Sequence, residues 1–64
     1  ESLSPREREI LLLLADGETT ATAADRLGVG ESTVRTHVER MRSKLCVNTR
    51  AAVVAEGFRL GYLD

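Results

Sequence analysis

Apolar residues recur every three or four positions along most of this chain, which is the spacing of one face of an α-helix. Near the N-terminus, the residues that share such a face are Leu3, Ile10, Leu11 and Leu14. Ser4 and Glu7 have the spacing of a capping box, and Pro5 suits the first helical position. The pattern therefore predicts a helix over about 5–15, which Gly17 is placed to end.

Two further segments carry apolar stripes of their own. One predicts a helix over 21–27, with Thr20 as its cap and Gly28 at its end. The other predicts a helix over about 50–60 that begins after a cap at Thr49. No segment alternates between apolar and polar residues as a strand would, so the sequence predicts an all-α domain.

The segment between them predicts the longest helix, over 31–45. At about 100° per residue, its apolar stripe spans about 60° and consists of Val34, Val38, Met41 and Leu45. The opposite face consists of Ser32, Thr36, Glu39, Arg40 and Ser43. This face is flanked by Arg35 and Arg42 on one side and by Thr33, His37 and Lys44 on the other. A short helix, a tight turn and this longer helix predict a helix-turn-helix within a four-helix, bundle-like domain.

The charges are distributed unevenly along the chain, although its net charge is only −1. Residues 1–34 hold seven acidic and three basic side chains, whereas residues 35–50 hold one acidic and five basic side chains. Such a split indicates one basic face, although a solvated helix with ordinary surface charge would give the same count. Small polar groups between basic flanks fit the major groove of duplex DNA, so double-stranded DNA is the expected partner.

Other classes of function find little support in these 64 residues. Cys46 is the one cysteine and His37 the one histidine, too few for a metal cluster, and no nucleophile stands in a catalytic pattern. The longest apolar run, "ILLLLA", is too short to span a bilayer. We therefore expect no enzyme, metal, cofactor or membrane partner, and a cytoplasmic location. The chain lacks an initiator Met, so we expect residues 1–64 to be one domain cut from a longer protein.

Three stretches, "LSPREREILLLLADG", "TVRTHVERMRSKLCVNTR" and "GYL", resemble the LuxR-type (FixJ- or GerE-type) helix-turn-helix domain of bacterial transcription regulators. The resemblance runs without a gap from Leu3 to Leu63. It implies a four-helix domain that usually lies at the C-terminus of a larger protein, such as a response regulator. In such domains the second and third helices form the helix-turn-helix, and the fourth often mediates dimerisation.

Residue roles follow partly from this resemblance. Arg35 stands where the family has a basic residue on the backbone and guanine edges, and Thr36 stands at a position that faces the bases. Thr33 and Lys44 match positions that contact phosphate. The predicted DNA contacts combine these positions with the outward face of the third helix. They are Thr20, Thr33, Arg35, Thr36, Glu39, Arg40, Ser43, Lys44 and Arg50.

The chain also departs from the family pattern. The family's "SNKEIA" is here "TTATAA", so a lysine and an asparagine that hold the DNA backbone are missing. Glu39 stands where some relatives have lysine; its carboxylate would either accept a hydrogen bond from a cytosine amino group or repel the backbone. Cys46 replaces a glycine. We expect weaker non-specific binding than in a typical member.

The predicted fourth helix is apolar over most of its circumference. Its core residues are expected to be Val53, Val54, Gly57 and Leu60. The residues expected to stay uncovered are Ala51, Ala55, Phe58 and Tyr62. An uncovered apolar strip indicates a partner, and we favour a homodimer on an inverted-repeat operator over contact with another domain of the same chain.

Two alternative functions remain open at the level of sequence. A sigma-factor-like region that binds promoter DNA within RNA polymerase has a similar helix-turn-helix, but such regions tend to stop soon after the recognition helix. RNA polymerase is thus a further candidate partner. A helix-turn-helix adapted to bind protein is the other alternative, which the missing lysine near Ala21 and the carboxylate of Glu39 would favour.

Overall fold

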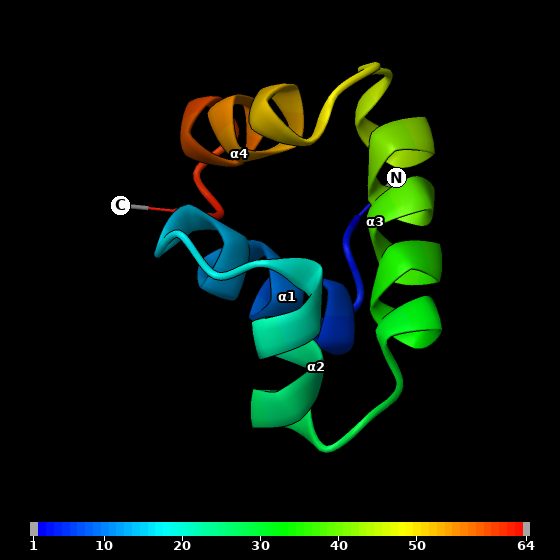
Figure 1. Ribbon diagram of the computed structural model, residues 1–64. Coiled ribbons are helices and arrows are strands. Elements are labelled where there is room, and N and C mark those ends of the chain that lie inside the picture. The colour runs from blue at the N-terminus through cyan, green and yellow to red at the C-terminus, as the bar shows by residue number, and fades with distance from the viewer. Residues whose placement is uncertain (1, 64) are drawn as a thin grey trace.

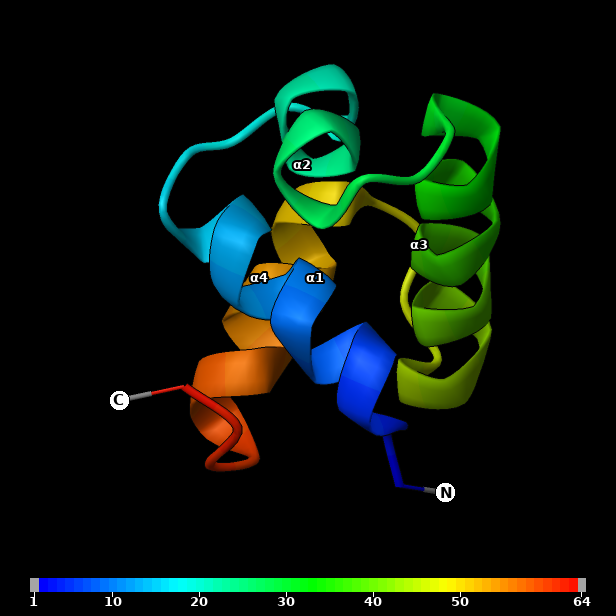
Figure 2. The ribbon, with the colours of Figure 1, turned by 90° about the horizontal axis from the view of Figure 1, so that it is seen from below.

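The computed structural model describes residues 2–63, which form four α-helices and no strand. These are α1 (Pro5–Ala15), α2 (Thr20–Leu27), α3 (Glu31–Leu45) and α4 (Arg50–Arg59). The predicted all-α class is confirmed, and every helix boundary lies within one residue of its prediction. In Figures 1 and 2, α1 lies centrally and packs against α2, α3 and α4, while α2 and α3 form the helix-turn-helix pair.

Local capping explains where the first two helices begin. The predicted capping box of α1 is confirmed: the Ser4 hydroxyl accepts from the Glu7 amide at 3.2 Å, and the Glu7 carboxylate accepts from the Ser4 amide at 2.8 Å. In α2 the predicted cap is wrong by one residue. Thr19 is the cap, because its hydroxyl accepts from the Thr22 amide while the Thr22 hydroxyl accepts from the Thr19 amide. Thr20 is therefore the first residue of the helix.

The core lies where α1 meets the other three helices. Its buried apolar residues are Leu3, Ile10, Leu11, Leu14, Ala23, Ala24, Val34, Val38, Met41, Val53 and Leu63. All members of the stripe predicted for α1 are buried, as are three of the four predicted for α3; Leu45 is partly buried. This burial fixes which face of α3 is turned outward.

The C-terminal end of the core differs from the prediction. Leu60, the C-cap of α4, is 47% exposed, and Leu63 fills the core against Gly57 instead, after the chain turns at Gly61. Gly57 is buried, and a Cβ at this position would lie 3.0 Å from side-chain carbons of Leu11 and Leu63. A glycine at this site allows α4 to approach α1 closely.

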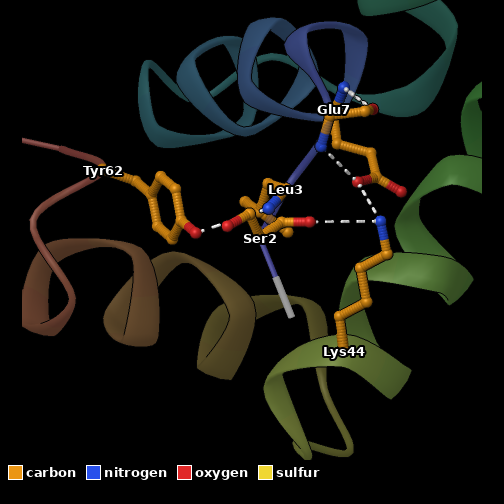
Figure 3. A network of polar contacts seen from close by, with 6 residues as sticks. Ser2, Leu3, Glu7, Lys44 and Tyr62 are labelled. Atoms are coloured by element: carbon orange, nitrogen blue, oxygen red, sulfur yellow. Dashed lines mark hydrogen bonds and ion pairs between the residues drawn. The ribbon is translucent and has the colours of Figure 1, made fainter.

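A buried ion pair joins the beginning of α1 to the end of α3. The Nζ atom of Lys44 donates to the Glu7 carboxylate at 2.8 Å and to the Ser2 carbonyl at 3.4 Å (Figure 3). Only 3% of the Glu7 side chain is exposed. The sequence predicted the capping role of Glu7 but not this burial.

The environment of Glu7 sets its protonation. Burial by itself would raise the pKa of the Glu7 carboxyl, but the hydrogen bonds from Lys44 and Ser4, with the charge of Lys44, hold that pKa below its ordinary value. The folded state therefore favours the ionised carboxylate. The contribution of the ionised Glu7 carboxylate to stability is complete when the pH is above the ordinary glutamate pKa. This contribution is lost as the pH falls through the lower pKa that Glu7 has in the folded state.

We predict that Glu7→Gln lowers the free energy of unfolding at neutral pH by about 1–3 kcal/mol, because it removes a charged hydrogen-bond acceptor. The variant should also lose less stability than the wild type below about pH 4.3. Urea unfolding at several pH values measures both effects. Glu9→Gln is the matched control, since the side chain of Glu9 is 56% exposed. An acid dependence in Glu7→Gln equal to that of the wild type would contradict this account.

The backbone of Cys46 predicts a stabilising substitution. Cys46 is the C-cap of α3 in the left-handed conformation, with φ 57° and ψ 45°, and is the one non-glycine residue with positive φ among residues 2–63. A side chain costs about 1–2 kcal/mol in this conformation. Cys46→Gly should therefore raise the free energy of unfolding by about 1 kcal/mol in urea unfolding. Cys46→Ala keeps the Cβ atom and should show no such gain; an equal gain would assign the effect to the thiol.

Candidate nucleic-acid interface

The outer face of α3 is formed by side chains that the core leaves uncovered. In both ribbon views α3 stands at one edge of the molecule, with α1 and α2 on its inner side (Figures 1 and 2). The exposed residues of this outer face are Ser32, Thr36, Glu39, Arg40 and Ser43, as the helical periodicity predicted. Because most of them are small, an approaching surface could come close to the helix backbone.

Hydrogen bonds to residues one turn earlier in α3 hold Arg35 and Thr36, two of the predicted contact residues. Arg35, with 63% of its side chain exposed, pairs with Glu31 one turn earlier. The Thr36 hydroxyl donates to the Ser32 carbonyl at 3.0 Å. Its proton is thus used within the helix, and the methyl group and an oxygen lone pair remain to face a partner.

The cationic residues of the interface differ in how far they are engaged. Arg42 pairs with Glu39 at 2.7 Å. Within residues 2–63 no ion pair involves Arg40 or Arg50, and both are exposed. These two guanidinium groups can therefore meet an anion without first leaving an internal partner.

Lys44 lies differently from the other predicted cations. Its ammonium group donates to Glu7 and Ser2, and its side chain is 23% exposed (Figure 3). Lys44 is therefore a structural partner of α1 in this fold. To contact a phosphate, the Lys44 ammonium would have to bind the phosphate and the Glu7 carboxylate at once, or leave Glu7. The predicted phosphate contact of Lys44 stays a prediction.

The remaining predicted contacts lie around the ends of the helix-turn-helix. Thr20 is half-buried in the first turn of α2, and Thr33 is exposed near the beginning of α3. Arg50 is the first residue of α4. Arg26, at the end of α2, pairs with Glu18 at 3.2 Å. The outer face of α3 thus presents its exposed side chains together, whereas Thr20 and Arg50 belong to the neighbouring helices α2 and α4.

Sequence reasoning missed two features of this surface. The pairing of Arg42 with Glu39 was not predicted, although their three-residue spacing is a signal for it. The pairing of Lys44 with Glu7 joins residues 37 positions apart, so no local pattern indicates it.

A separate surface lies on α4. Ala51, Ala55 and Phe58 are exposed and share one helical stripe, which we name the α4 strip. Phe58 is 50% exposed. Tyr62 was expected to belong to this strip but does not. Its hydroxyl accepts a hydrogen bond from the Leu3 amide at 3.3 Å, and the Cζ atom of Arg8 lies 5.4 Å from the centroid of its ring.

Residues 2–63 contain neither a membrane-spanning helix nor a candidate metal site. No helix there is long and apolar enough to cross a membrane. No three His, Cys, Asp or Glu side chains in the described part of the chain gather into a group that could hold a metal ion.

Comparison with known proteins identifies the family. Residues 1–56 match the model for bacterial regulatory proteins of the luxR family. The probable transcriptional regulatory protein NarL of Mycobacterium tuberculosis H37Rv is 50% identical over 62 residues, which are 97% of this chain but 29% of that protein. The spore germination protein GerE of Bacillus subtilis is 40% identical over 97% of this chain and 84% of its own length.

A solved structure agrees with the sequence matches. The structure of the transcription factor GerE superimposes with a TM-score of 0.92 at 38% identity, covering 100% of this chain and 97% of that one. The chain spans less than a third of the NarL protein that it matches. This chain belongs to the luxR family of bacterial regulatory proteins.

Proposed function

We propose that this chain binds double-stranded DNA sequence-specifically, with α3 in the major groove, as the DNA-binding part of a bacterial transcription regulator. The observation that carries the proposal is the outer face of α3, which is uncovered, rich in small polar groups and flanked by arginines. Its likeness to proteins described as transcriptional regulators supports the same function. The small share of NarL that the chain covers supports a longer regulator. A regulator that binds the bacterial chromosome would act in the cytoplasm.

The geometry suggests that one set of side chains contacts the bases in the complex and another set contacts the phosphates. Ser32, Thr36 and Ser43 would let α3 approach the base edges, where Arg35 could read guanine once it leaves Glu31. Arg40 and Arg50 would contact phosphates and so fix the position of the protein on the duplex. Among the acidic residues of 2–34 only Glu31 lies on α3, so the net charge of −1 is compatible with this interface.

We predict that Arg35→Ala lowers the affinity for the selected operator by about 10-fold or more, because one base contact is lost. Duplexes are first selected from a random library with the wild type, and affinities are then measured by fluorescence anisotropy. Arg6→Ala is the matched control, since Arg6 is an exposed arginine on α1. Equal affinity of Arg35→Ala and wild type, or an equal loss in Arg6→Ala, would contradict the role of α3.

We also propose that two copies associate through the α4 strip, which would place two copies of α3 on one face of an inverted-repeat operator. The support is the exposed apolar side chain of Phe58, which follows two exposed alanines, Ala51 and Ala55, on the same stripe. Half-sites would then lie about one helical turn apart. Another domain of a longer chain could cover the strip instead, and RNA polymerase is a further candidate partner of the whole regulator.

We predict that Phe58→Glu shifts the chain toward the monomer in sedimentation velocity, because a carboxylate would be buried in the apolar contact. On an inverted repeat the variant should bind with lost cooperativity, while its affinity for a single half-site is unchanged. Leu12→Glu is the control, since Leu12 is also exposed, at 51%, but lies on α1. A wild type that stays monomeric on the inverted repeat would contradict the dimer.

A further inference from the structure

A carboxylate stands on the face that we propose to meet DNA. The side chain of Glu39 is 64% exposed in the middle of the outer face of α3. Glu31, the other acidic residue of α3, lies in its first turn, where the helix dipole stabilises an anion. Glu39 has no such benefit. A carboxylate so placed would repel the phosphates on either side of the groove.

The ion-pair partner of Glu39 is Arg42, which pairs with no other anion among residues 2–63. The Oε1 atom of Glu39 lies 2.7 Å from a terminal nitrogen of Arg42, whose side chain is 35% exposed. The Nε atom of Arg42 is buried and has no hydrogen-bond partner within residues 2–63. Among these residues Glu39 is the one anion paired with Arg42, so releasing the pair would free a cation beside the outer face.

We propose that Glu39 and Arg42 together act as a specificity determinant that selects a cytosine in the operator. On DNA without the correct base, the ion pair between Glu39 and Arg42 would stay intact. Arg42 would then make no phosphate contact, and the phosphates would repel the Glu39 carboxylate. Opposite a cytosine, the amino group of the base would donate to the Glu39 carboxylate, and Arg42 would turn to a neighbouring phosphate. This inference rests on the proposed function, because it requires α3 in the major groove.

The chemistry of the groove favours cytosine over the other bases. An ionised carboxylate only accepts hydrogen bonds, and cytosine offers a donor at N4. Guanine and thymine offer acceptors at the same edge, which would repel the carboxylate. Adenine offers a donor beside an acceptor, a pair that suits a carboxamide better. Glutamine at this position should therefore prefer a different base.

The test compares base preference in four proteins: the wild type, Glu39→Ala, Glu39→Gln and Glu9→Gln. Duplexes are selected from a random library, and each base pair of the selected half-site is then replaced in turn. The wild type should prefer cytosine at one position by about 10-fold or more. Glu39→Ala should lose this preference alone, and Glu39→Gln should move it to adenine.

Non-specific binding provides a second readout, which a merely structural role of the pair would not change. On a duplex without the selected site, Glu39→Ala should bind several-fold more tightly than the wild type. The slope of log affinity against log salt should be steeper by about 0.9, as expected for one more phosphate contact by Arg42. Glu9→Gln removes a carboxylate from another exposed ion pair, the one between Glu9 and Arg6 on α1 at 4.0 Å. This control should leave the salt slope unchanged.

Two results would overturn the inference in different ways. If the wild type selects a sequence and Glu39→Ala keeps the same base preferences and salt slope, the role of Glu39 is wrong and the proposed function stands. If the wild type selects no duplex even at low salt, the proposed function and this inference both fail.

Discussion

The burial of one apolar stripe of α3 against the other three helices is the constraint on which the rest of this structure depends. Val34 and Met41 are fully buried, and the helical period then requires Thr36, Arg40 and Ser43 to face outward. The core therefore does more than stabilise the domain, because it decides which side chains of α3 face the duplex in the proposed complex. A rotation of α3 by one residue would bury a charged side chain and expose part of the stripe.

The pairing of Glu7 with Lys44 fixes the far end of the same helix. The stripe determines the rotation of α3 about its axis, while this pair ties the last turn of α3 to the first turn of α1 (Figure 3). Breaking a buried pair leaves a charge without compensation, so its loss is costly even where its net gain is small. The same carboxylate caps α1, which couples the beginning of α1 to the placement of α3.

The local features of this fold were predictable, and the long-range ones were not. Caps at Ser4 and Thr49 and the α3 stripe follow from spacings of three and four residues, and the structure contains them. The cap of α2 was misplaced because two adjacent threonines could each serve, and only Thr19 has Thr22 three residues later. Leu63 fills the core in place of Leu60 only because the chain turns back at Gly61. That turn, like the contacts of Tyr62 and Lys44, is part of the tertiary structure, which no local pattern contains.

The central claim is that the outer face of α3 contacts duplex DNA, and chemical-shift mapping by NMR tests it most directly. The account predicts that a selected duplex shifts the amide signals of α3 around Thr36 and Arg40 most strongly, with smaller shifts at the beginnings of α2 and α4. The signals around Leu12 on α1 should change little. Shifts that cluster on the α4 strip, with none on α3, would contradict the claim.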